Sequence, residues 1–150
     1  MATNQRQPIY LFRLEIDGIT RAYFQKISGL KATLEVDEYD EGGSMITQKD
    51  AGKPTYPNIV LTGAMTEDLQ MYNWFQEVLD AVDGIGEDPI NYKKNFDVVS
   101  LNRKKQEIMR HRVIASFPVD HDLGDYDASQ KSGYRLETIE LAQERNYIVQ

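Results

Sequence analysis

The chain has 150 residues, 41% apolar and 27% charged, a balance typical of one soluble globular domain rather than of a disordered protein. Its formal net charge of −7 argues against general binding to phosphate backbones or anionic membranes, which both need a basic surface. The absence of cysteine excludes disulfides, thiolate metal sites and a cysteine nucleophile.

The N-terminal segment, residues 1–8, is polar, ends in proline and predicts a flexible arm. It lacks the apolar stretch of a signal peptide, and nowhere is the chain apolar for long enough to predict a transmembrane helix. We therefore expect synthesis and folding in the cytosol.

The first elements show the two-residue period of strands. Alternating apolar and polar side chains predict a half-buried strand over residues 10–16. Asp17 and Gly18 then favour a tight hairpin turn, because glycine accepts a positive φ. A second strand is expected over residues 19–27, and renewed alternation predicts a third over 32–39.

A long segment, residues 40–57, interrupts this pattern with glycines, prolines and few apolar residues. It predicts an extended irregular loop, and loops of this length are usually functional or disordered. Met45 and Ile46 are apolar residues within it, which suggests contact with a partner. Continuous apolar character then predicts a strand over 58–63.

One helix is predicted, over residues 66–82. Thr66 can cap its start, and the apolar residues that follow fall on one stripe at helical spacing. The stripe consists of Leu69, Tyr72, Phe75, Val78, Leu79 and Val82. Trp74 lies just beside it and is expected to be partly buried.

The second half of the chain returns to strands. The pattern predicts a strand over 96–101, a charged turn over 102–106, a strand over 108–117, an acidic loop over 118–133 and a last strand over 134–147. Strands around a single helix favour a mainly β fold of two packed antiparallel sheets, or an antiparallel barrel. We expect one domain over residues 1–150, because no linker or repeat divides the chain.

The residues that could carry chemistry are few. His111 is interpreted as an ordinary strand residue, and the cluster between Asp120 and Asp127 around His121 lacks the spacing of an EF-hand. A solvated acidic loop is the preferred interpretation of that cluster, and a solvated turn that of residues 103–105. We expect no catalytic residue, no cofactor and no metal site, and hence no enzyme.

Several segments together resemble the tail-tube protein family of contractile phage tails and extracellular contractile injection systems. The matching segments are FRLEIDGI (12–19), FQKISGL (24–30), EYDEGG (38–43), KPTYPNIVLTGAMTED (53–68), Trp74-Phe75, ASFP (115–118) and LETIELAQERNY (136–147). The likeness covers nearly the whole chain.

The resemblance implies a structural subunit of the inner tube, folded as two packed antiparallel sheets with one helix. Such subunits form hexameric rings that stack around a lumen for DNA or protein cargo. The implied partners are further copies of the chain, a sheath protein, and baseplate, hub and tail-terminator proteins. The implied location is a virion tail or an injection particle, after assembly in the bacterial cytoplasm.

The long segment is the candidate subunit and ring interface, since it can reach a neighbouring copy and gain order on contact. The predicted contact residues are Tyr39, Asp40, Glu41, Gly42, Gly43, Ser44, Met45, Ile46, Lys49, Gly52, Lys53 and Tyr56.

Three alternatives remain open from sequence. A tube-initiating or tube-terminating relative would share the fold without polymerising. A small-molecule-binding β-barrel would need an apolar cavity. A hydrolase using the Asp120 to Asp127 cluster would need a divalent ion.

Overall fold

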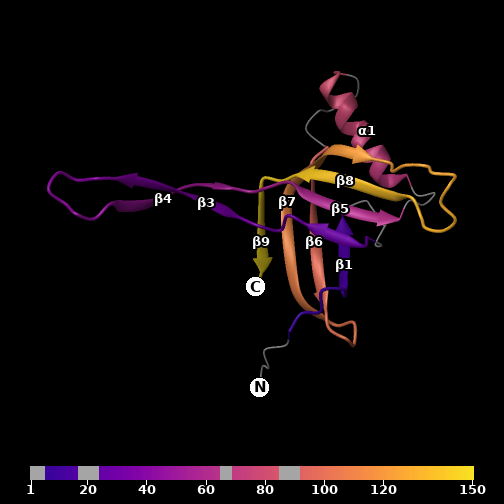
Figure 1. Ribbon diagram of the computed structural model, residues 1–150, viewed down its shortest axis with the longest axis horizontal. Helices are drawn as coiled ribbons and strands as arrows, with labels where there is room; N and C mark the ends of the chain where they lie inside the picture. The colour runs from indigo at the N-terminus through magenta and orange to yellow at the C-terminus, as the bar shows by residue number, and fades with distance from the viewer. Residues whose placement is uncertain (1–5, 17–23, 65–68, 85–91) are drawn as a thin grey trace.

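The computed structural model describes residues 6–16, 24–64, 69–84 and 92–150 (Figure 1). Its elements are β1 (Phe12–Ile16), β2 (Lys26–Ser28), β3 (Thr33–Tyr39), β4 (Gln48–Thr55), β5 (Ile59–Ala64), α1 (Gln70–Val82), β6 (Lys94–Leu101), β7 (Glu107–Asp122), β8 (Leu136–Ala142) and β9 (Arg145–Val149). The fold is mainly β with one described helix, as predicted.

Two antiparallel sheets form the body and share one long strand. The first sheet has the order β1-β6-β7-β9, and the second has the order β7-β8-β5-β2. The first part of β7 pairs with β6, and its last part pairs with β8 from Phe117 onward. The prediction of two packed antiparallel sheets is confirmed.

A bulge lies at the point where β7 passes from one sheet to the other. Ile114 and Ala115 together face the single residue Asn95 of β6. The Ala115 N–H donates to Asn95 Oδ1 at 2.8 Å, and the φ of Ala115 is 52°. An extra residue in one strand bends that strand and increases its twist, so the bulge directs β7 toward the second sheet.

The core fills the space between the two sheets. Leu14 and Ile16 of β1 are buried while Arg13 and Glu15 are exposed, as the alternation predicts. The buried apolar cluster consists of Leu14, Ile16, Phe24, Ile59, Leu61, Met71, Trp74, Val78, Phe96, Val98, Val113, Ile139 and Leu141.

The helix ends at Val82 as predicted, but it begins at Gln70, later than expected. Leu69 precedes the helix without a side-chain cap bond, and the predicted cap Thr66 lies outside the described residues.

The predicted buried face of the helix is only partly correct. Met71, Trp74 and Val78 are buried, whereas Leu69, Tyr72, Leu79 and Val82 of the predicted stripe are exposed. The face that contains Trp74 is buried because the indole has the largest apolar area on the helix. The indole Nε1–H also donates a hydrogen bond to the Tyr92 carbonyl at 2.7 Å.

The strands of the second half differ from the prediction mainly at the end of β7 and within the last strand. Residues 118–122 belong to β7 and not to the acidic loop, because they pair with β8. The last strand is divided into β8 and β9 at Gln143 and Glu144. Gln143 leaves the strand alternation because its Nε2 donates to the carbonyls of Pro57 at 2.7 Å and of Gly29 at 3.3 Å.

Part of the N-terminal half cannot be compared with its prediction. The Asp17-Gly18 turn and most of the predicted strand 19–27 lie outside the described residues, and the described remainder, β2, pairs with β5. Of the predicted arm 1–8, only residues 6–8 are described.

Candidate assembly surface

Strands β3 and β4 form a separate two-stranded hairpin that projects from the body (Figure 1). The prediction of an irregular loop over 40–57 is therefore wrong for residues 48–55. The sequence QKDAGKPT of β4 has no apolar alternation, so its strand conformation depends on pairing with β3. The predicted strand over 32–39 is confirmed as β3 within one residue.

A bulge in the hairpin accommodates the glycine and proline of β4. Leu34 faces Pro54 and Val36 faces Ala51, so β4 has one more residue than β3 between these pairs. A Cβ at Gly52 would lie 3.0 Å from the Glu35 carbonyl oxygen, which favours glycine there. Bulges of this kind twist an exposed edge away from unwanted pairing.

The tip of the hairpin is an ordered turn rather than a loose loop. Ser44 N–H donates to the Glu41 carbonyl at 3.0 Å, and Gly43 has a φ of 87°, which a residue with a side chain rarely adopts. The Ser44 hydroxyl oxygen accepts a hydrogen bond from Ile46 N–H at 3.2 Å. This turn leaves Met45 fully exposed and Ile46 76% exposed.

The described part of the chain covers little of the hairpin. Every residue from 31 to 47 is exposed, including Leu34 and Val36 at 53% and 55%. One described ion pair, Lys49 Nζ to Glu38 Oε1 at 3.8 Å, links its strands. Several large apolar side chains exposed on one projecting element indicate an interaction site.

The structure places the predicted interface residues on this one hairpin or at its base. Tyr39 ends β3, residues 40–46 form the turn, and Lys49, Gly52 and Lys53 lie on β4. Tyr56 follows β4 and is half-buried.

Open strand edges are a second feature of the surface. Among the described strands, β1 pairs only with β6, β2 only with β5 and β9 only with β7. Each therefore presents one unpaired edge, which can accept a strand of another chain.

The charges on the first sheet, in contrast, are satisfied within the chain. Arg110 contacts Asp97, Glu15 and Glu107 at 2.6 to 2.9 Å, and Arg112 Nε donates to Asp97 Oδ1 at 2.9 Å. Burial acts to raise the pKa of Asp97, but the hydrogen bonds from the two arginines lower it below its usual value. This cluster joins β1, β6 and β7.

The two histidines have structural contacts. His111 Nε2 lies 2.8 Å from Asn146 Oδ1. His121 Nε2 lies 2.8 Å from Glu137 Oε1, and both of these side chains are 2% exposed. Sequence reasoning missed the second pair because its members come from the predicted loop and the last strand.

The hydrolase alternative depends on a metal site in the cluster between Asp120 and Asp127. In the part of the chain that the structure describes, no three His, Asp or Glu side chains are placed to hold a metal ion. No described helix has the length and apolarity to cross a membrane.

A two-sheet body with open strand edges and an unpacked hairpin defines a subunit that assembles with other chains. The sequence profile of the T4-like virus tail tube protein gp19 family matches residues 8–146, and the chain belongs to this family. It is a structural subunit of a tail tube and not an enzyme. No curated protein sequence matches the chain.

Solved structures share the fold along the whole chain. The PVC sheath/tube terminator structure of an extracellular contractile injection system matches with a TM-score of 0.80 and 21% identity, covering 99% of this chain and 100% of that one. The PVC sheath–tube complex in the extended state matches with a TM-score of 0.78 and 19% identity, covering 97% and 93%. The 6-fold symmetrised anti-feeding prophage baseplate matches with a TM-score of 0.73 and 23% identity, covering 99% and 97%.

Proposed function

We propose that the chain acts as a single-domain subunit that closes into hexameric rings, and that the rings stack into the inner tube around a lumen. The observation that carries this proposal is the β3–β4 hairpin, whose apolar residues stay exposed in the part of the chain that the structure describes. The likeness to a structure described as 6-fold symmetrised supports the ring size.

The open edges supply the second contact of the ring. A heterologous contact, made by different surfaces on each copy, closes into a ring when its rotation allows. Pairing the edge of β1 or β9 with a strand of the next copy removes the unpaired N–H and C=O groups that would otherwise invite aggregation. The hairpin residues from Tyr39 to Tyr56 then serve as the subunit and ring interface.

The remaining partners follow from the proposed tube. A sheath protein surrounds it, baseplate and hub proteins begin it, and a terminator ends it. The likeness to sheath–tube, baseplate and terminator structures supports these partners. The lumen carries DNA or a protein cargo, and assembly takes place in the bacterial cytoplasm before the particle acts.

Sedimentation velocity and electron microscopy of the purified chain test the proposal. Wild-type protein at increasing concentration should form rings and tubes, whereas the double variant Met45→Ser, Ile46→Ser should remain monomeric because it lacks the apolar tip. Tyr134→Ser, which removes another exposed apolar side chain, is the matched control and should assemble. A wild-type chain that stays monomeric at all concentrations would refute the proposal.

A terminator role is the second candidate, since the terminator structure matches with a TM-score of 0.80, against 0.78 for the sheath–tube complex. Microscopy separates the two roles. A terminator forms single rings that do not stack, whereas a tube subunit forms stacks whose length increases with concentration.

A further inference from the structure

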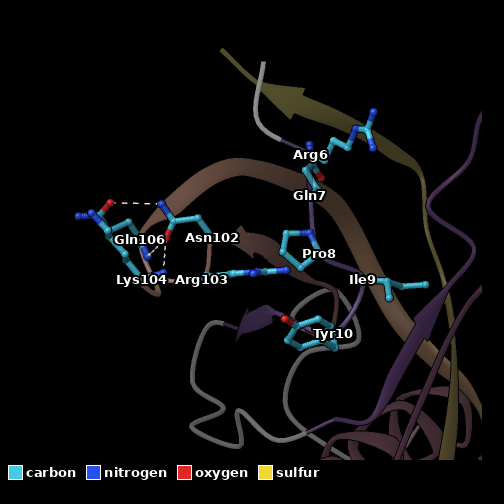
Figure 2. Close-up of a pocket in the computed structure, with 9 residues that line it drawn as sticks. All are labelled: Arg6, Gln7, Pro8, Ile9, Tyr10, Asn102, Arg103, Lys104 and Gln106. Atoms are coloured by element: carbon cyan, nitrogen blue, oxygen red, sulfur yellow. Dashed lines mark hydrogen bonds between the residues drawn. The ribbon is translucent and has the colours of Figure 1, made fainter. Parts of the chain in front are cut away.

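A cleft with exposed cations lies at one end of the body (Figure 2). It has a volume of about 650 Å³ and lies between the N-terminal segment and the β6–β7 turn. Arg6 comes from the first of these segments, and Arg103 and Lys104 come from the second. The sequence predicts a flexible arm and a solvated turn for these segments, and it does not predict the cleft because they lie far apart in the chain.

The β6–β7 turn holds its basic residues in a defined conformation. Asn102 Oδ1 accepts hydrogen bonds from the N–H groups of Lys104 and Gln106, each at 2.9 Å. Lys105 N–H donates to the Asn102 carbonyl at 2.8 Å. The Leu101 N–H donates to the Leu11 carbonyl at 3.0 Å, which ties the N-terminal segment to β6. The cleft is thus formed by two segments that are fixed relative to each other.

The cations of the cleft have no acidic partner among the described residues. No described carboxylate forms an ion pair with Arg6, Arg103 or Lys104, although the chain as a whole carries a net charge of −7. The nearby arginines Arg110 and Arg112, by contrast, are paired with acidic side chains. A concentration of unpaired cations on an acidic protein attracts an acidic partner.

The hairpin has the complementary composition. Between residues 33 and 55 it contains six carboxylates against two lysines, and its turn contains Asp40 and Glu41 without a basic residue. The turn also presents the exposed Met45 and Ile46. The cleft is likewise lined by both cations and exposed apolar side chains: Ile9 is 93% exposed and Tyr10 is 66% exposed.

We propose that the acidic tip of the β3–β4 hairpin docks into this basic cleft on a neighbouring copy of the chain. Carboxylates of the tip then face Arg6, Arg103 and Lys104, and Met45 and Ile46 cover Ile9 and Tyr10. The contact is between copies because the hairpin and the β6–β7 turn project from the body in different directions (Figure 1). The proposal rests on the proposed tube function and names the surface that receives the hairpin.

Nucleic acid is the other occupant that a basic cleft could attract. The hairpin is favoured because the cleft combines charge with exposed apolar side chains, and the hairpin tip offers both in return. In such a contact, the complementary charges provide specificity and the burial of the apolar side chains provides affinity.

Disulfide trapping tests the contact directly, because the natural chain contains no cysteine. A Ser44→Cys variant, with the cysteine at the hairpin tip, is mixed with a Gln106→Cys variant, with the cysteine at the cleft. Oxidation should yield a covalent dimer of the two variants. Ser44→Cys mixed with Ser132→Cys, on an exposed loop outside the cleft, is the matched control and should yield none.

Charge exchange tests the same contact without a crosslink. Arg103→Glu with Lys104→Glu, or Asp40→Lys with Glu41→Lys, should each raise the concentration needed for assembly about tenfold. The chain that combines all four changes should assemble at nearly the wild-type concentration, because the charges are again complementary. Circular dichroism checks that each variant is folded.

The outcomes separate this contact from the tube function itself. Rings or tubes without the expected covalent dimer, or without rescue by the combined variant, refute the docking contact and leave the tube function standing. If a short duplex DNA binds the wild-type chain but not the Arg103→Glu, Lys104→Glu variant, and no covalent dimer forms, the cleft binds nucleic acid instead of the hairpin. Absence of any ring or tube refutes both proposals.

Discussion

The body and the β3–β4 hairpin of this chain are stabilised in opposite ways. The body buries an apolar cluster between two sheets and pairs its charged residues internally. The hairpin exposes its apolar residues and has one described ion pair. The body therefore contains the contacts needed to fold in the isolated chain, whereas the apolar residues of the hairpin remain exposed and available to a partner.

The largest effect on stability is expected at the centre of the body. Trp74→Ala removes a side chain that is 2% exposed and the hydrogen bond to the Tyr92 carbonyl. The free energy of unfolding should fall by about 3–5 kcal/mol, because the change leaves a cavity. Urea denaturation measures it, and Leu79→Ala, at a 40% exposed position on the same helix, should cost less than about 1.5 kcal/mol. Equal losses would mean that the assigned buried face of α1 is wrong.

A smaller effect, with a defined pH dependence, is expected at the charge cluster of the first sheet. Asp97→Asn should lower the free energy of unfolding at pH 7 by about 1–2 kcal/mol, because two arginines lose an anionic acceptor.

The sign of the pH effect follows from the lowered pKa of Asp97 in the folded chain. The stabilisation is fully present above the unfolded pKa of about 3.9 and is lost as the pH falls through the folded value. Denaturation curves of wild type and variant should therefore differ at pH 7 and converge at pH 2–3. A difference that stays constant over this range would contradict the cluster's role.

The smallest effect on stability is expected in the hairpin. Met45→Ser should change the free energy of unfolding of the monomer by less than about 0.5 kcal/mol, since Met45 is fully exposed. Assembly should nevertheless weaken, because the hairpin tip loses one of its two exposed apolar side chains. A large loss of monomer stability would show that the tip packs within its own chain and would end the contrast with the body.

The sequence predicts the body better than the hairpin for a physical reason. Period-two alternation at Leu14 and Ile16 reports burial on one sheet face, and this signal locates most strands of the body. In β4 neither face is buried, so no alternation remains, and only the pairing with β3 makes it a strand.

The remaining differences arise from individual side chains. Trp74 changes the buried face of the helix, and Gln143 divides the last strand by bonding to two distant carbonyls. The glycines of the segment 40–57, together with Met45 and Ile46, predict an interface there, and the structure shows that this segment is exposed. The cleft was missed because its cations come from two segments far apart in sequence, although three consecutive basic residues in an acidic chain are a signal that could have pointed to it.

The long strand β7 has a mechanical consequence. Because one continuous backbone belongs to both sheets, the bulge at Ala115 and Asn95 is a covalent joint between them. A load applied to one sheet therefore reaches the other through peptide bonds as well as through side-chain packing. Within one subunit, this joint opposes the sliding of one sheet past the other.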